Sequence, residues 1–374
     1  MEGENVKKEN IDYSFVQNQN IQDKICEKVK GQILYLSFNL DSSCFSVGHK
    51  NGFIVYDANA LKIRYCVDDI GEIKIVEVLK KTNLSAFVGS SNNKLYSTNC
   101  IQLWDDRDRK IIAYKQFNDT ILKIKFKSQM LFIVTTQNLY VLNTETFETI
   151  DEFELNYLNP KILSVSSNDS NTVLSWSHNN SGKINIKIYN KGNSNDENSS
   201  TYVLSCHNNP IRYISLNNDG TLLATASIKG TLIRIFDITN GASKIQEVRR
   251  GSSLAEISLI SFNHDSKFLC VSSDKNSIHI FSVRDPKNKK NVTLNQTSTL
   301  KYIPLPTNYF TSEWSFAKIY LSNINDYYII SFASPTNDHP NSIIVISKSG
   351  ICFKYTFKPN TSQTNKILNG KWLQ

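Results

Sequence analysis

Short apolar runs, many of them alternating with polar residues, recur along the chain and are separated by turns rich in Asn, Asp and Ser. Three segments share one pattern: residues 37–49 (SFNLDSSCFSVGH), 215–227 (SLNNDGTLLATAS) and 261–273 (SFNHDSKFLCVSS). Each predicts a strand, an Asn/Asp turn and a second strand. A third apolar run follows each segment, and an aromatic residue followed by Asp closes several of these runs, as in Tyr56-Asp57 and Phe236-Asp237. No long amphipathic helix is predicted.

The spacing of these units predicts the fold. Most intervals between unit starts are 40 to 50 residues, and about 40–45 residues is the period of a four-stranded propeller blade. We therefore predict an all-β, seven-bladed, WD40-like β-propeller with four-stranded antiparallel blades. The opening strand of each blade is expected near Ile33, Ile73, Ile121, Ile162, Ile211, Ile257 and Ala317.

The propeller is expected to span residues 29–360. Residues 1–28 are polar and predict a tail or an extra strand, and residues 361–374 predict a C-terminal tail. A low-complexity loop, residues 191–200, interrupts blade 4. The longest interruption, residues 284–312, is the blade-6 loop. A loop of this length in a compact fold is usually functional or disordered, and both interpretations stay open.

Composition excludes several classes of protein. The polar first twenty residues predict no signal peptide, and no apolar run is long enough to span a membrane. The net charge of +8 suits an anionic partner but is too dilute for a dedicated nucleic-acid binder, so no nucleic-acid partner is expected. The seven cysteines contain no CxxC pair, which favours buried thiols in a reducing cytosol. No catalytic, metal or cofactor motif occurs, so we predict neither an enzyme nor a cofactor.

The most informative local feature is the pair Arg249-Arg250, at the expected end of blade 5. On a strand the two side chains must point to opposite sides, so they face different inter-blade crevices. The neighbouring acids, Glu247 and Glu256, are too few to neutralise both arginines. A guanidinium in such a crevice is suited to bidentate binding of phosphate.

Blades 5 and 6 offer hydroxyls and cations at equivalent repeat positions, with Ser227 matching Ser273 and Lys229 matching Lys275. The alternative is that these residues only satisfy turns. Together with the arginine pair, the duplicated sets predict two similar anion sites. The candidate residues are His207, Ser227, Lys229, Thr231 and Arg234 in blade 5, and Ser253, Ser272, Ser273, Lys275 and His279 in blade 6.

Residues 248–251 (VRRG) resemble the FRRG/LRRG motif of the PROPPINs, which are WIPI-type seven-bladed propellers that bind phosphoinositides. The resemblance extends from residues 37–53 to residues 342–355 and includes residues 100–111, 224–237 and 313–321. It implies binding of phosphatidylinositol 3-phosphate and phosphatidylinositol 3,5-bisphosphate at two sites. Site 1 would comprise His207, Ser227, Thr231, Arg234 and Arg249; site 2 would comprise Arg250, Ser253, Ser272, Ser273, Lys275 and His279. The departure is Val248, where the family usually has Phe or Leu.

The blade-6 loop then gains a membrane role, because its lysines suit an anionic surface and its apolar residues suit the interfacial layer. The residues proposed for this contact are Lys289, Lys290, Val292, Leu294, Leu300 and Tyr302. The alternative is an inert Asn-rich insertion.

The resemblance further implies that blades 2–3 recruit an autophagy lipid-transfer protein or another scaffold. The candidate contacts are Trp104, Asp105, Asp106 and Arg107, although this charged turn could equally be a solvated hairpin tip. The expected protein is a monomeric, cytoplasmic effector that binds phagophore, autophagosomal, endosomal or vacuolar membranes reversibly. Two alternatives are a WD-repeat scaffold without lipid selectivity and an enzyme that uses the central channel.

Overall fold

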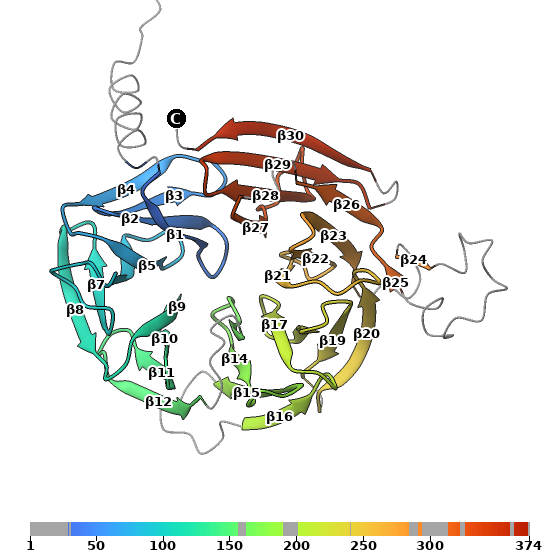
Figure 1. The fold of residues 1–374 in the computed structure, drawn as a ribbon, viewed down its shortest axis with the longest axis horizontal. Helices are drawn as coiled ribbons and strands as arrows, with labels where there is room; N and C mark the ends of the chain where they lie inside the picture. Colours follow the sequence, from blue (N-terminus) through green and yellow to red (C-terminus); the bar gives the residue numbers. More distant parts are fainter. Residues whose placement is uncertain are drawn as a thin grey trace, which may run out of the picture.

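Seven β-sheets form a closed ring around a central axis in the computed structural model (Figure 1). The structure describes residues 29, 31–155, 162–189, 201–239, 241–283, 291–293, 313–321, 326–359 and 363–372. All thirty elements within these residues are strands, and each sheet contains four antiparallel strands that form one blade. The predicted seven-bladed β-propeller is confirmed.

The strands follow in chain order from the axis outward. Blades 1 and 2 consist of β1 (Ile33–Phe38), β2 (Cys44–His49), β3 (Gly52–Asp57), β4 (Ile63–Asp68), β5 (Ile73–Val78), β6 (Leu84–Gly89), β7 (Cys100–Asp105) and β8 (Lys110–Gln116). Blades 3 and 4 consist of β9 (Ile121–Lys127), β10 (Met130–Thr135), β11 (Asn138–Asn143), β12 (Thr149–Glu154), β13 (Leu163–Val165), β14 (Thr172–Ser177), β15 (Lys183–Tyr189) and β16 (Thr201–Ser205).

The remaining blades carry the candidate site. Blade 5 consists of β17 (Ile211–Leu216), β18 (Leu222–Ser227), β19 (Leu232–Asp237) and β20 (Ser243–Arg249), extended at its edge by β25 (Glu313–Trp314) and β24 (Val292–Thr293). Blades 6 and 7 consist of β21 (Ile257–Phe262), β22 (Phe268–Ser273), β23 (Ser277–Ser282), β26 (Ala317–Tyr320), β27 (Tyr328–Phe332), β28 (Ser342–Ser347), β29 (Ile351–Phe357) and β30 (Thr364–Lys371).

The sequence repeat corresponds to a repeated turn. In blades 1, 5 and 6 an Asn side chain after the first strand accepts a hydrogen bond from the backbone amide five residues later. The three bonds are Cys44 N to Asn39 Oδ1 at 2.9 Å, Leu222 N to Asn217 Oδ1 at 2.9 Å and Phe268 N to Asn263 Oδ1 at 2.8 Å. Each bond satisfies the first amide of the second strand, so Asn at this position fixes the hairpin geometry.

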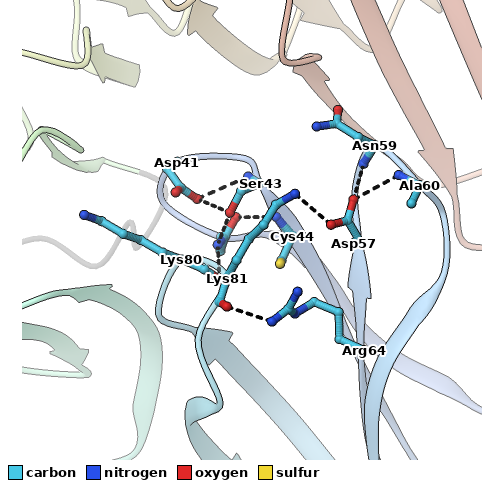
Figure 2. Close-up of polar contacts among 10 residues, drawn as sticks. Asp41, Ser43, Cys44, Asp57, Asn59, Ala60, Arg64, Lys80 and Lys81 are labelled. Carbon is cyan, nitrogen blue, oxygen red and sulfur yellow. Dashed lines mark hydrogen bonds and ion pairs between the residues drawn. The ribbon is translucent and has the colours of Figure 1, made fainter.

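Polar contacts also join blade 1 to blade 2, as Figure 2 shows. The Lys81 ammonium lies 2.7 Å from the Asp57 carboxylate, and the Arg64 guanidinium donates a 2.7 Å hydrogen bond to the Lys81 carbonyl. Asp57 itself accepts two 2.9 Å bonds from the amides of Asn59 and Ala60, which closes the turn after β3. These cations are therefore engaged in holding adjacent blades together.

The ring closes where blade 7 meets blade 1. Trp372, which is 2 % exposed, packs edge-on against Phe45 and Tyr56 with ring centroids 5.4 and 5.3 Å apart. Its indole N–H donates a 2.9 Å bond to the Ser347 carbonyl. Because burying a large aromatic side chain contributes a few kcal/mol, this contact anchors the end of the chain.

Two sequence expectations were wrong. Ala317 does not open blade 7: β26 is the outer strand of blade 6 and pairs with β23, whereas β27 opens blade 7. Residues 361–374 are not simply a tail, because β30 pairs with β29 over Thr364–Lys371 and completes blade 7. Residues 1–28, 191–200 and most of the blade-6 loop lie outside the described residues.

Candidate functional site

A cavity of about 310 Å³ opens between the β16–β17 connection and blade 5. All five residues predicted for site 1 line it. The full lining is His207, Asn208, Asn209, Ser227, Lys229, Thr231, Leu232, Arg234 and Arg249. The sequence prediction missed Asn208 and Asn209. Their position directly after His207, in the loop that enters blade 5, is the signal that could have found them.

Arg249 is the last residue of β20 and Arg250 follows it, and the two side chains have different surroundings, as strand alternation predicts. Val248 between Glu247 and Arg249 is fully buried and packs in the core shared by blades 5 and 6. Arg249 points the other way and is half-buried at the cavity. The side chain at position 248 therefore packs inward, as expected for the family position.

Arg234 is held in place by two contacts. Its Nε donates to Glu247 Oε2 at 2.8 Å, across the β19–β20 pair, and its Nη1 donates to the Cys206 carbonyl at 2.6 Å. Glu247 thus neutralises Arg234 within blade 5. The other nearby acid, Glu256, pairs with Arg212.

His207 is neutral near pH 7. Its Nε2 lies 2.9 Å from the Thr225 hydroxyl. Burial, with the Arg234 charge beside it, lowers the pKa of His207 to about 4. The imidazole can therefore contribute a hydrogen bond to site 1 but no positive charge at neutral pH.

Arg250 is enclosed on the blade-6 side and is 4 % exposed. Its Nε donates to the Gly230 carbonyl at 2.9 Å and its Nη2 to the Ser253 carbonyl at 2.5 Å. Burial lowers the pKa of Arg250, and the Asp274 charge opposes that shift. Two of the five N–H donors of this guanidinium thus hold the backbone around site 2.

The other residues predicted for site 2 have different environments. Ser272, Ser273 and His279 are buried, whereas Ser253 and Lys275 are exposed. Ser253 contacts Arg250 through its backbone carbonyl. The ammonium of Lys275 lies 3.6 Å from Asp274. Site 2 therefore combines buried hydroxyls with a surface cation that has an acid next to it.

His279 connects site 2 to the end of the blade-6 loop. Its Nδ1 lies 3.0 Å from the Ser315 hydroxyl and its Nε2 lies 3.2 Å from the Ser277 hydroxyl. Burial, followed by the charges of Lys318 and Arg250, lowers the pKa of His279 to about 3. Sequence reasoning missed Ser277 and Ser315, although Ser277 occupies the repeat position that matches Thr231.

The base of the blade-6 loop is part of the sheet of blade 5. β25 runs parallel to β20 and pairs Glu313 with Val248 and Trp314 with Arg249. Glu313 Oε2 accepts hydrogen bonds from Gln246 at 2.6 Å and from buried Asn291 at 2.8 Å. The described parts of this segment are therefore attached, through β25, to the strand that ends at Arg249.

Of the residues predicted for the membrane loop, Val292 lies in β24, where its backbone pairs with Trp314. The others, Lys289, Lys290, Leu294, Leu300 and Tyr302, lie outside the described residues. Their membrane role stays a prediction.

The charged turn of blade 2 is largely self-contained. Trp104 and Asp105 are 8 % and 9 % exposed, and Asp105 accepts a 2.9 Å bond from the Arg107 amide. Asp106 accepts bonds from the Trp104 indole and from Arg109, at 3.3 and 2.8 Å. Of the four predicted contact residues, only Arg107 is exposed. Burial thus makes Trp104 and Asp105 scaffold residues of the turn.

A second cavity, of about 380 Å³, lies on the axis and is lined by inner strands that include Lys123, Lys125 and Tyr213. Lys125 forms a 2.6 Å ion pair with Glu77, which is 1 % exposed. Burial raises the pKa of Glu77, and Lys125 opposes that shift. Among the described residues, no group of three or more His, Cys, Asp or Glu side chains could hold a metal ion. No described helix is long and apolar enough to cross a membrane.

The fold and the site define a seven-bladed β-propeller with paired arginines at the boundary of two blades. The PROPPIN family model matches residues 33–363, and the chain belongs to this family. SVP1-like protein 2 of Debaryomyces hansenii is 31 % identical over 85 % of this chain and 83 % of the relative. Autophagy-related protein 21 of Pichia angusta is 29 % identical over 67 % of this chain and 65 % of the relative.

Solved structures show the same fold. Hsv2 of Kluyveromyces lactis superposes with a TM-score of 0.72 at 21 % identity and covers 91 % of this chain and 99 % of that one. A complex of KlAtg21 with the coiled-coil of AgAtg16 superposes with a TM-score of 0.69 at 22 % identity, with the same coverage. The relatives include autophagy-related proteins 18 and 21.

Proposed function

We propose that this protein is a peripheral membrane effector that binds phosphatidylinositol 3-phosphate and phosphatidylinositol 3,5-bisphosphate through sites 1 and 2. The observation that carries the proposal is the cavity lined by Arg249, Arg234 and Lys229 together with the hydroxyls of Ser227 and Thr231. Its volume of about 310 Å³ is at the lower end for a small-ligand site and suits a polar headgroup.

The chemistry of the two sites fits phosphate. Guanidinium groups bind phosphate oxygens bidentately, and charge-assisted hydrogen bonds are about twice as strong as neutral ones. Site 1 offers the half-buried Arg249 with exposed Lys229 at the cavity, and site 2 offers Arg250 with exposed Lys275. Two headgroup sites on one rigid edge bind a membrane multivalently, so avidity exceeds the affinity of either site.

Membership of the PROPPIN family supports a role in autophagy or endolysosomal membrane traffic. We place the protein in the cytoplasm, as a monomer that binds phagophore, autophagosomal, endosomal or vacuolar membranes reversibly. The relatives named autophagy-related proteins 18 and 21 support this assignment.

We further propose that blades 2 and 3 bind a protein partner, either an autophagy lipid-transfer protein or another scaffold. The complex of KlAtg21 with a coiled-coil supports a helical protein as one class of partner. In this chain, exposed Arg107 and the outer-strand residues Ile112 and Tyr114, 45 % and 71 % exposed, offer a surface on blade 2.

Liposome co-sedimentation tests the lipid proposal. Arg249→Thr with Arg250→Thr should reduce binding to vesicles that contain phosphatidylinositol 3-phosphate about tenfold or more, because each charge-assisted contact contributes about 1.5–3 kcal/mol. Arg107→Thr, an exposed arginine of blade 2, is the matched control and should bind as wild type does.

Thermal melts of both variants accompany the assay, because Arg250 also holds backbone. A folded double variant that binds these vesicles as well as wild type would refute the proposal. Wild-type protein that shows no preference for 3-phosphorylated lipid would instead favour a WD-repeat scaffold.

A further inference from the structure

Two large apolar side chains are exposed between sites 1 and 2. Ile228, in the β18–β19 turn, is 51 % exposed, and Leu254, in the β20–β21 connection, is 67 % exposed. Both lie outside the blade-6 loop. Single exposed apolar residues are common, but exposed apolar side chains on two adjoining connections, next to two cationic sites, can mark a surface that contacts a membrane.

Backbone contacts bring together the two segments that carry these residues. The Ala255 amide donates to the Lys229 carbonyl at 3.2 Å, and the Ile228 amide donates to the Pro210 carbonyl at 2.9 Å. Gly230 lies so near the same segment that a Cβ there would meet the Ala255 carbonyl oxygen at 1.9 Å. The turn after β18 and the connection after β20 therefore form one surface.

The repeat shows that this turn does not need an apolar residue. The position of Ile228 corresponds to Lys50 in blade 1 and to Asp274 in blade 6, and both of those residues are polar and exposed. Gly230 and Asn276, two positions further on, both adopt a positive φ, of 61° and 50°. The same turn thus forms with a charged residue, and Ile228 adds nothing that the turn requires.

The charges around the two residues identify the occupant. Exposed Lys229 lies next to Ile228, Arg249 faces the cavity on one side, and Arg250 lies on the other. An apolar pair flanked by cations matches the chemistry of an anionic lipid surface, with headgroup phosphates at the level of the cations and acyl chains beyond them.

We propose that Ile228 and Leu254 insert into the interfacial layer of the membrane while the flanking arginines hold phosphoinositide headgroups. This inference rests on the proposed function of sites 1 and 2. It assigns membrane contact to the propeller itself, in addition to any contact that the blade-6 loop makes.

The test compares vesicles with a soluble ligand. Ile228→Ser with Leu254→Ser should weaken binding to phosphatidylcholine vesicles containing phosphatidylinositol 3-phosphate about tenfold, because two half-exposed aliphatic side chains lose their burial. Binding of a short-chain, water-soluble phosphatidylinositol 3-phosphate, measured by calorimetry, should not change. Leu95→Ser is the matched control, since Leu95 is 65 % exposed in the β6–β7 connection of blade 2; it should bind vesicles as wild type does.

Tryptophan fluorescence measures insertion directly. In Leu254→Trp, the fluorescence of the added tryptophan should shift to the blue on vesicles and be quenched by brominated acyl chains, relative to wild type. The inference would be overturned if the double serine variant bound vesicles with unchanged affinity and the added tryptophan were not quenched. The proposed function would survive that result if Arg249→Thr with Arg250→Thr still abolished vesicle binding. If wild type bound neither the vesicles nor the soluble lipid, the proposed function itself would fail.

Discussion

Arg249 and Arg250 are adjacent in sequence, yet their surroundings differ. Arg249 is half-buried at an open cavity, whereas Arg250 is 4 % exposed and donates to two backbone carbonyls. A strand delivers consecutive side chains to opposite faces, so one dipeptide supplies two different kinds of cation. Site 1 is an open cavity, and site 2 is built around a guanidinium that also supports the fold. A motif of two identical residues therefore need not describe two equivalent sites.

The largest effect is expected at Gly230, whose carbonyl accepts the Arg250 bond. Its φ of 61° and the 1.9 Å approach of a Cβ to Ala255 predict that Gly230→Ala lowers the free energy of unfolding by about 3 kcal/mol. Gly241→Ala is the control, because Gly241 has a similar φ of 75° but open space around it, and should cost about 1 kcal/mol. Urea unfolding measures both. Equal losses of unfolding free energy in the two variants would mean that the turn at Gly230 can relax to accommodate the added Cβ.

A smaller effect separates the two arginines directly. Arg250→Ala leaves the carbonyls of Gly230 and Ser253 without their donor and should cost about 2 kcal/mol of stability. Arg249→Ala should cost less than about 1 kcal/mol, because the side chain is partly solvated, while it weakens vesicle binding. Chemical denaturation and co-sedimentation together check this. Similar stability losses in the two variants would remove the distinction between an open and an enclosed site.

The smallest effect concerns pH. The pKa of His279 is lowered to about 3 and that of His207 to about 4, so the unfolded chain binds more protons than the folded one below about pH 6.5. Stability should therefore fall as the pH drops from 7 to 5. His279→Gln should reduce that fall by about 1–2 kcal/mol, and His207→Gln by nearly the same amount, because both folded-state pKa values lie below pH 5. Unfolding at the two pH values measures the difference, and an unchanged slope in His279→Gln would contradict it.

Much of the ring could be predicted from the sequence because its signals are local. Asn39, Asn217 and Asn263 mark the same hairpin, and each makes the same bond to the following strand. The errors lie where the local signal is weak. The strand over Thr364–Lys371 is polar and lacks clear alternation, so only its pairing with β29 identifies it. The sequence of Ala317–Tyr320 resembles an opening strand. It is the outer strand of blade 6, and the long blade-6 loop separates it in sequence from β23, the strand with which it pairs.

The candidate site also has features that the sequence predicts and features that it does not. Strand alternation was enough to predict that Arg249 and Arg250 face different crevices. The matching repeat positions pointed to residues that line the site 1 cavity. The carbonyl partners of Arg250 could not be predicted, because they depend on the close approach of two connections. The ion pair between Arg234 and Glu247 depends on the register of β19 and β20, which the sequence alone leaves open.

The paired strands β24 and β25 at the edge of blade 5 hold the two ends of the long blade-6 segment side by side. Once its ends are fixed, lengthening a loop costs little, about 0.6 kcal/mol for each doubling. Sequence between Thr293 and Glu313 can therefore be gained, lost or exchanged during evolution with little penalty to the propeller. Strands β24 and β25 thus let the length of the segment between them vary while the strand that ends at Arg249 stays the same.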